Sequence, residues 1–223
     1  MSHYDYQHIV VKRIAGALGA EISGVDLSQQ LERDVVSEIH QAFLDHLVIF
    51  FRHQELDPHQ LLTFAQLFGD PIDYPQTKGL PECPKVIPVV KLEHEKVNFG
   101  GVWHSDTTYL EHPPKASLLY AIEVPPSGGD TLFANQYLAY ETLSDGLKET
   151  LGSLTAVNTS AKPEMARTRK ERQAEDGVSL KVIEAVHPVV RMHPETGRKT
   201  LYVNTAHTTH IEGWTREESE ALL

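Results

Sequence analysis

Cysteine is almost absent from this sequence of 223 residues, which contains a single one, Cys83. One cysteine cannot form an internal disulfide, and it excludes a metal site built from several thiolates. Basic residues are also scarce, 20 against 31 acidic residues, and the formal net charge is -11. Because nucleic-acid binders need a basic surface, we expect small-molecule partners and no nucleic acid.

Long apolar runs are missing as well. No stretch approaches the roughly 20 apolar residues that cross a bilayer, and no basic start followed by an apolar run resembles a signal peptide. We therefore expect a cytoplasmic protein with no membrane partner. The hydrophobic content of 40% is sufficient for a core, and the length suits one domain spanning residues 1–223.

The first third of the sequence alternates between strand and helix patterns. Short strands are expected at residues 9–11 and within the glycine-punctuated stretch 16–27. Apolar residues recur at helical spacing over residues 31–45, and the unbroken apolar run at residues 47–51 is typical of a buried strand. Asp57 before Pro58 is an N-cap pair that predicts a second helix, with its buried side at Leu61, Leu62, Phe64 and Leu67. A proline-rich loop follows at residues 71–84.

The rest of the chain predicts further short elements. Strands are expected at four places, with a turn at residues 194–197 joining the last two: residues 86–90, 116–122, 186–192 and 200–204. Residues 136–151 predict one helix with its buried face at Leu138, Tyr140, Leu143 and Leu147, and a last helix begins near Thr215, with Glu218 at the capping-box position. The charged segment 162–177 predicts a mobile lid or, alternatively, a solvated helix.

A candidate metal site lies at residues 103–109, with the sequence Trp-His-Ser-Asp-Thr-Thr-Tyr. Threonine and tyrosine favour a strand, on which residues two apart share one face. His104 and Asp106 are therefore expected to converge, as two of the three ligands of a 2-His-1-carboxylate site for Fe(II). A His-x-Asp pair is common by chance, so a solvated strand end is the competing interpretation of the pair alone.

The surrounding motifs carry a resemblance that covers nearly the whole chain. They are residues 103–109, Pro-Pro-Lys-Ala at 113–116, Gly-Gly-Asp-Thr-Leu-Phe at 128–133, the stretch 16–27, His-Pro-Val-Val-Arg at 187–191 and Gly-Arg-Lys at 197–199. Together, and in their order along the chain, these motifs resemble the taurine dioxygenase family of Fe(II)- and 2-oxoglutarate-dependent oxygenases. The resemblance implies an α+β fold with a double-stranded β-helix (jelly-roll) core and flanking helices, whereas spacing alone supports only a mixed α/β or α+β class.

The resemblance also implies the chemistry. In the family, Fe(II) is bound by the His-x-Asp motif, matched by His104 and Asp106, and by a distal histidine. The far carboxylate of 2-oxoglutarate meets a threonine, matched by Thr131, and an arginine near the C-terminus. The distal histidine and the arginine would follow Leu223, so we expect the sequence to lack C-terminal strands and a helix. The expected reaction consumes O2 and releases succinate and CO2.

Substrate specificity is expected at five positions: Tyr74, Asn98, Phe99, Gly100 and His207. Taurine-cleaving members carry a histidine and an asparagine where this sequence has Tyr74 and Gly100. His207 falls where family members place an aromatic residue that lines the pocket. We therefore expect hydroxylation or oxidative cleavage of a small organic acid, a carboxylate or sulfonate other than taurine. The segment 187–204 is also similar to the aryloxyalkanoate-degrading branch of the family.

Two other functions compete with a dioxygenase. One is a catalytically silent family member that serves as a metal-binding or assembly module, which the missing third ligand favours. The other is a zinc hydrolase, because histidine and aspartate also bind zinc, although no general base or nucleophile is placed beside them. A homo-oligomer is expected in addition.

Overall fold

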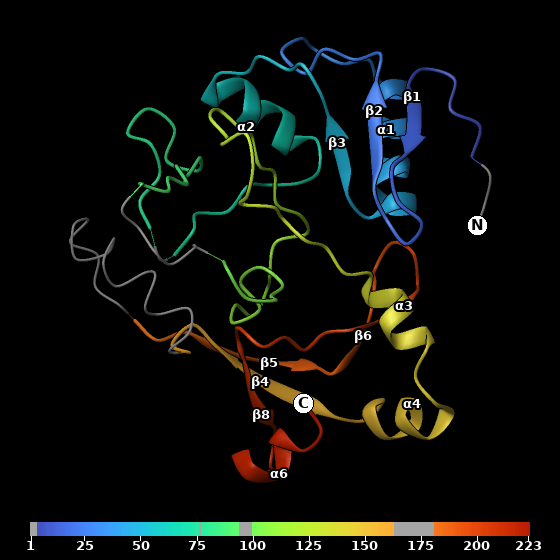
Figure 1. The fold of residues 1–223 in the computed structure, drawn as a ribbon, viewed down its shortest axis with the longest axis vertical. Coiled ribbons are helices and arrows are strands. Elements are labelled where there is room, and N and C mark those ends of the chain that lie inside the picture. The colour runs from blue at the N-terminus through green and yellow to red at the C-terminus, as the bar shows by residue number, and fades with distance from the viewer. Residues whose placement is uncertain (1–3, 76, 94–99, 163–180) are drawn as a thin grey trace. The chain divides into compact units, whose positions relative to one another are not determined.

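The computed structural model describes residues 4–75, 77–93, 100–162 and 181–223. The chain divides into two compact units. The first unit comprises Met1–Pro71 and Leu118–Leu138, and the second comprises Ile72–Ser117 and Ala139–Leu223. Each contains helices and strands, in agreement with an α+β class (Figure 1). A single domain over residues 1–223 stays a prediction.

The first unit is built on a three-stranded sheet in the order β1-β2-β3. Strand β1 (Val10–Arg13) runs antiparallel to β2 (Ala20–Ser23), and β2 runs parallel to β3 (Ile49–Phe51). Helix α1 (Arg33–His46) is the crossover that the parallel pair requires (Figure 1). The first two strands, the helix and the strand after it confirm the sequence prediction, except that β3 is half-buried rather than fully buried.

The core of the first unit joins this sheet to its helices. Its buried members are Ile9, Ile22, Leu27, Ile39, Ala42 and Phe64. Phe64 comes from helix α2 (Pro58–Gln66), which begins with the predicted cap: Asp57 accepts from the Gln60 backbone, and the Gln60 side chain accepts from the Asp57 backbone. Leu67, expected on the buried side of this helix, is 45% exposed. Full burial of one large apolar side chain such as Phe64 stabilises the folded state by about 1.5–3 kcal/mol.

A buried carboxylate anchors the N-terminal segment to α1. Glu38 accepts hydrogen bonds from the backbone N–H groups of Gln7, His8 and Ile9 at 2.7, 2.9 and 3.1 Å, and it is only 4% exposed. Burial alone would raise the pKa of Glu38, but the three backbone donors outweigh it, and its pKa lies below the ordinary value.

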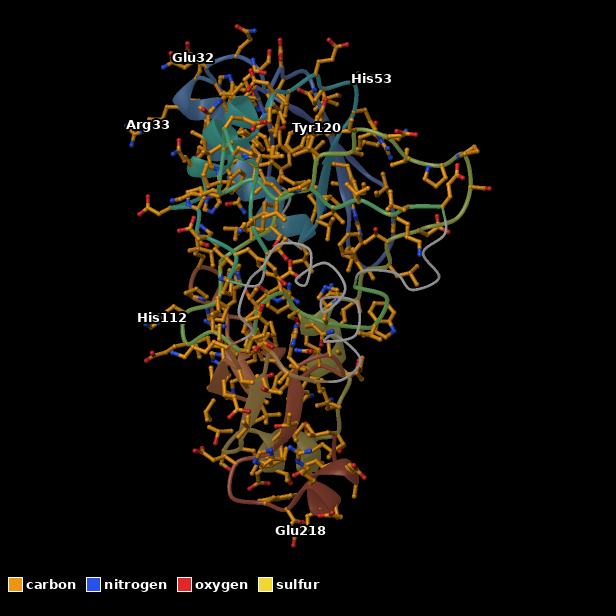
Figure 2. The ribbon with its side chains drawn as sticks, turned by 90° about the vertical axis from the view of Figure 1, so that its left-hand side faces the viewer. Glu32, Arg33, His53, His112, Tyr120 and Glu218 are labelled. Carbon is orange, nitrogen blue, oxygen red and sulfur yellow. The ribbon has the colours of Figure 1, made fainter. Side chains whose placement is uncertain are left out.

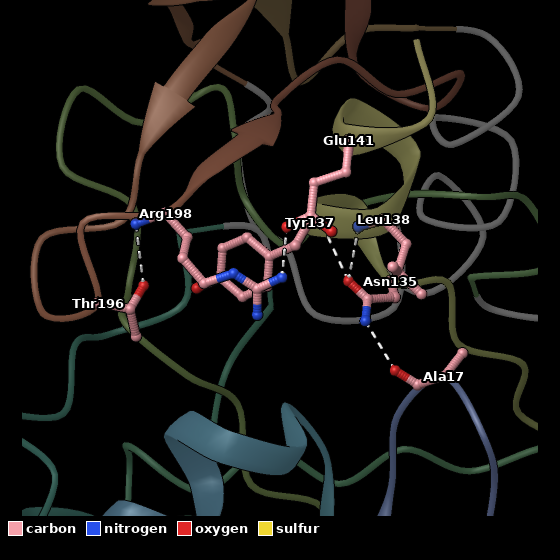
Figure 3. A network of polar contacts seen from close by, with 7 residues as sticks. All are labelled: Ala17, Asn135, Tyr137, Leu138, Glu141, Thr196 and Arg198. Atoms are coloured by element: carbon pink, nitrogen blue, oxygen red, sulfur yellow. Dashed lines mark hydrogen bonds and ion pairs between the residues drawn. The ribbon is translucent and has the colours of Figure 1, made fainter. Parts of the chain in front are cut away.

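Two polar side chains of the segment Leu118–Leu138 form hydrogen bonds to earlier parts of the first unit. The Tyr120 hydroxyl accepts from the Leu56 backbone and donates to the Gln54 carbonyl, both at 3.2 Å (Figure 2). Asn135 accepts from the backbones of Tyr137 and Leu138, and it donates to the Ala17 carbonyl at 2.7 Å (Figure 3). Asn135 thus joins the start of helix α3 (Gln136–Glu141) to a loop 118 residues earlier.

The second unit contains an antiparallel sheet in the order β5-β4-β8 and a separate hairpin. Strand β4 (Thr155–Thr159) pairs with β5 (Glu184–Pro188) on one side and with β8 (Thr208–Ile211) on the other. The hairpin of β6 (Val190–Met192) and β7 (Lys199–Leu201) is antiparallel. The hairpin confirms the pair predicted around residues 194–197, whereas β4 and β8 were not predicted.

One helix packs on the edge of this sheet at β8, and another contacts the hairpin. Helix α6 (Arg216–Glu220) has the predicted capping box of Thr215 and Glu218, which is labelled in Figure 2. Its buried Ser219 accepts from the Ile211 backbone at 3.0 Å and so holds the helix to β8. In the hairpin turn, Arg198 pairs with Glu141 of α3 at 2.6 Å (Figure 3).

Four element predictions were wrong: the strand at residues 103–109, which is described with the candidate metal centre, two further strands and one continuous helix. Residues 86–90 and 116–122 are irregular rather than strands, and within them Val89, Leu119 and Ile122 are 55%, 78% and 90% exposed. Residues 116–120 do alternate between inward and outward side chains, but no neighbouring strand pairs with them among the described residues. An extended segment without a ladder partner is not a strand.

The helix predicted at residues 136–151 is divided into α3 and α4 (Asp145–Leu151). Ser144 has extended backbone angles and caps α4 by accepting from the Leu147 backbone, which ends any continuous helix there. The buried residues are Tyr137 and Leu151, while Leu138 and Leu147 are each 40% exposed. The predicted lid lies outside the described residues from position 163 onward. In the described ranges no helix is long and apolar enough to cross a membrane.

Candidate metal centre

His104 and Asp106 face each other in the second unit. His104 Nε2 and Asp106 Oδ1 are 3.2 Å apart. Two atoms that bind one metal at right angles, each about 2.0–2.2 Å from it, are themselves about 3 Å apart. The pair therefore has the spacing of neighbouring metal ligands.

Each side chain of the pair also has a hydrogen-bond partner for its second polar atom. His104 Nδ1 donates to the Val102 carbonyl at 2.8 Å, which directs Nε2 toward Asp106. Asp106 Oδ2 accepts from the Ser117 hydroxyl at 2.5 Å, while Oδ1 faces His104. Such partners orient the ligands before a metal arrives.

The electrostatics favour an ionised aspartate. The hydrogen bond from His104 is the largest cause that lowers the pKa of Asp106; burial opposes it, and the Ser117 hydroxyl and the charges of His104 and His207 lower it further. The pKa of Asp106 therefore lies below its ordinary value of 3.8. The carboxylate form that a cation needs is present at neutral pH.

The pair lies on a loop and not on the predicted strand. Residues 103–105 are irregular, and residues 106–109 form a turn, closed by the Leu110 backbone donating to the Thr107 carbonyl at 2.9 Å. Thr107 has a φ of 49°, which is rare for a β-branched residue. The convergence of His104 and Asp106 was predicted correctly, but its cause is loop geometry rather than the alternation of a strand.

A buried polar cluster lies directly after the pair. The Thr108 hydroxyl donates to Asn158 Oδ1 at 3.2 Å and accepts from Asn204 at 3.3 Å. The Thr208 hydroxyl donates to the same Asn158 oxygen at 2.9 Å. Asn158 and Thr108 are fully buried, so these bonds fix the end of the loop to β4 and β8.

A second bond fixes the start of the loop, where the Thr205 hydroxyl donates to the Trp103 carbonyl at 2.9 Å. Sequence reasoning missed Ser117, Asn158 and Thr205. No local pattern marks them, since they lie 11, 52 and 99 positions beyond Asp106 in the printed sequence.

His207 lies near the pair and is buried, with 1% exposure. Its ring packs edge-on against Tyr109, with ring centroids 5.0 Å apart, and Nδ1 lies 3.2 Å from the Thr159 carbonyl. Its backbone donates to Asn204 Oδ1 at 2.9 Å. His207 contributes to the lowered pKa of Asp106, so it is close enough to the pair to affect its charge.

Gly100 lies against His104. It has a φ of +74°, and a Cβ placed there would be 3.2 Å from His104 Cε1 and 3.8 Å from Nε2. This combination of a positive φ and a close approach favours glycine. Gly100 is therefore placed beside His104, while its predicted role in substrate specificity stays a prediction.

The other predicted residues are not brought to the pair by any described contact. Tyr74 is half-buried in an irregular segment of the second unit. Thr131 is exposed in an irregular segment of the first unit. Asn98 and Phe99 lie outside the described residues. Their roles stay predictions.

A third protein ligand is not found in the described part of the chain, where no group of three or more His, Cys, Asp or Glu side chains is placed to hold a metal. His187, His193 and His210 have structural contacts instead: His187 bonds the Leu110 carbonyl, His193 accepts from the turn at Glu195 and Thr196, and His210 meets the Thr209 hydroxyl. His104 and Asp106 thus fit two positions of a facial site.

A family model described as "Taurine catabolism dioxygenase TauD, TfdA family" matches residues 11–223. The chain belongs to this family. As a member of the TauD, TfdA family it is an Fe(II)- and 2-oxoglutarate-dependent dioxygenase, which confirms the predicted enzyme class, metal and co-substrate.

Relatives of this TauD, TfdA family chain include proteins named for sulfate ester chemistry. An "Alkylsulfatase" of Acinetobacter baylyi is 35% identical, over 97% of this chain and 69% of the relative. An "Alpha-ketoglutarate-dependent sulfate ester dioxygenase" of Pseudomonas putida is 36% identical, over 96% of this chain and 71% of the relative. A crystal structure of a taurine dioxygenase from Burkholderia xenovorans is similar with a TM-score of 0.79 and 34% identity, over 97% of this chain and 70% of that one.

Proposed function

We propose that this dioxygenase hydroxylates or oxidatively cleaves a small organic acid at a metal held by His104 and Asp106. The observation that carries the proposal is the 3.2 Å separation of His104 Nε2 and Asp106 Oδ1, with each side chain held from behind. Bound Fe(II) with 2-oxoglutarate activates O2 and supplies the oxidising power, while the co-substrate becomes succinate and CO2. A jelly-roll core with flanking helices is part of the same proposal, supported by the similarity to a solved family member.

The chain's own residues have three tasks in this proposal. His104 keeps Nε2 toward the metal because Nδ1 is used by the Val102 carbonyl. Asp106 stays ionised because its hydrogen bonds lower its pKa. Buried His207 packs against Tyr109, and its charge helps to lower the pKa of Asp106 and so to keep that carboxylate ionised.

Thr131 is proposed to donate its hydroxyl to the distal carboxylate of 2-oxoglutarate, on the strength of its place in the Gly-Gly-Asp-Thr motif. Thr131→Val should raise the Michaelis constant for 2-oxoglutarate. The expected factor corresponds to a loss of about 1.5–3 kcal/mol of binding free energy, the value of one hydrogen bond to a charged group. Steady-state kinetics with each substrate varied in turn measure this. Thr131→Ser is the matched control, and it should keep most of the affinity. Equal effects on both substrates would make Thr131 a structural residue only.

The substrate class is proposed to be a small carboxylate, sulfonate or sulfate ester other than taurine. The names of two relatives support sulfate esters. Tyr74 and Gly100 replace two polar residues of taurine-cleaving members, and a site that lacks a required polar partner discriminates steeply against that ligand. With Asn98, Phe99 and His207, these residues are proposed to set specificity, so that larger or flatter acids fit better.

A substrate panel tests this specificity in the full polypeptide. The panel contains taurine, longer alkyl sulfonates, alkyl sulfates, aryloxyalkanoates and aliphatic acids, with succinate and product measured together. We expect kcat/KM for taurine to be well below that for the best substrate. Taurine as the best substrate, with coupled sulfite release, would overturn the pocket argument. Absence of succinate formation with every acid would favour the silent metal-binding or assembly module.

A further inference from the structure

We propose that Ser117 is a positioning residue that sets the orientation of the Asp106 carboxylate for the metal. This inference rests on the proposed metal site, and it adds a residue that the family motifs do not contain. Ser117 lies 11 positions beyond Asp106 in the sequence, and its hydroxyl donates to Asp106 Oδ2 at 2.5 Å. The short distance is that of a hydrogen bond to an ionised acceptor.

The need for such a contact follows from the exposure of Asp106. Its side chain is 53% exposed, so packing does not lock its terminal torsion, which is intrinsically broad for aspartate. A carboxylate that rotates offers either oxygen, or both, to a cation. With Oδ2 held by Ser117, Oδ1 is the oxygen directed at His104 Nε2. The pair then presents one oxygen and one nitrogen, in a fixed order.

The histidine of the pair is fixed in a parallel way, but by backbone. The Val102 carbonyl holds Nδ1 at 2.8 Å, and Gly100 lies close to the ring edge. Substitution cannot remove a backbone carbonyl. For Asp106, in contrast, the partner of Oδ2 is the Ser117 side chain, so a single mutation can separate orientation from ligand identity.

The chemical consequence concerns how Asp106 binds. The hydroxyl occupies a lone pair of Oδ2 and draws charge from it, which favours binding through Oδ1 alone. Without the hydroxyl, Oδ2 is available to the cation or to water. Loss of a residue that orients a metal ligand in this way costs about 10–100-fold in metal affinity. We expect Ser117→Ala to fall in this range.

The experiment is Co2+ titration of the full polypeptide, by calorimetry and by visible absorption, in the wild type and in five variants, one of which is Asp106→Ala. Ser117→Ala removes the hydroxyl, Ser117→Thr retains it, and Ser117→Cys replaces it with a weaker donor. Ser105→Ala is the matched control, because Ser105 lies between the two ligands and no described hydrogen bond involves its hydroxyl. Thermal unfolding of the metal-free variants tests whether all of them are folded.

We expect wild-type affinity for Ser105→Ala, near wild-type affinity for Ser117→Thr, an intermediate loss for Ser117→Cys and the full loss for Ser117→Ala. The Co2+ absorption of Ser117→Ala should also change, since ligand geometry changes, while its metal-free unfolding temperature stays the same. Unchanged affinity in folded Ser117→Ala, or no recovery in Ser117→Thr, overturns the inference.

Failure of the metal site itself has a different signature. If wild type and Asp106→Ala bind Co2+ equally weakly, the proposed function is wrong and Ser117 has no metal ligand to orient. If Asp106→Ala loses Co2+ but Ser117→Ala does not, the site stands and only the role of Ser117 is refuted. The two results are therefore separable in one set of titrations.

Discussion

Replacement of His104 or Asp106 by alanine is expected to abolish Fe(II) binding and substrate-dependent succinate formation while the protein remains folded. A facial site has no spare protein ligand, so loss of either donor removes the metal. Their side chains are 28% and 53% exposed and lie on a loop, so neither contributes to a core.

Anaerobic Fe(II) titration and succinate assays measure this loss. His112→Ala is the control, because His112, labelled in Figure 2, is exposed in the same unit and no described contact joins it to His104 or Asp106. Its activity should equal that of the wild type. Full turnover in His104→Ala or Asp106→Ala would remove that residue from the site.

Replacement of Glu38 by alanine is expected to cause the largest loss of stability among single substitutions in the first unit. Three backbone N–H groups would lose their acceptor, and one hydrogen bond to a charged group contributes about 1.5–3 kcal/mol. Since Glu38 is almost completely buried, we expect a decrease in unfolding free energy of about 3 kcal/mol or more. Urea unfolding at neutral pH measures it.

The same carboxylate makes stability dependent on pH. The pKa of Glu38 in the folded state is below its ordinary value of 4.5, so the unfolded state takes up the proton first as the pH falls. Its contribution is complete above pH 4.5 and is lost as the pH falls through the folded-state pKa.

The stability difference between wild type and Glu38→Gln should therefore be constant near neutral pH and shrink in acid. Asp34→Asn, an exposed acidic position in the same helix, is the control with a small effect. A difference that grows as the pH falls would contradict this account of the buried carboxylate.

Much of the first unit could be predicted because its signals are local. The capping box at Asp57 and Gln60 and the helical spacing of residues 31–45 each concern neighbours a few positions apart, and both elements formed as expected. The break at Ser144 is equally local, but its capping side chain competes with apolar spacing that runs through the whole segment. There the apolar spacing predicts one continuous helix, whereas Ser144 favours an N-cap, and the structure has the cap and two separate helices.

The sheet of the second unit could not be predicted in the same way. Strand β4 contains Thr155, Asn158 and Thr159, a polar composition that does not read as a buried strand. Asn158 is nevertheless fully buried, because the hydroxyls of Thr108 and Thr208 satisfy its oxygen. Burial of a polar group depends on partners distant in sequence, so no window of the sequence reveals it.

By itself the sequence determined the family and the enzyme class with its Fe(II) and 2-oxoglutarate, and it singled out His104 and Asp106 as the candidate pair, since these follow from residue types at short, ordered spacings. Only the tertiary structure decided that the pair lies on a loop with Thr107 at positive φ, and that Ser117 holds Asp106 from behind. The physical reason is the sequence separation of the interacting residues. A motif records neighbours along the chain, whereas the direction of a ligand atom is set by hydrogen bonds from segments that meet only after folding.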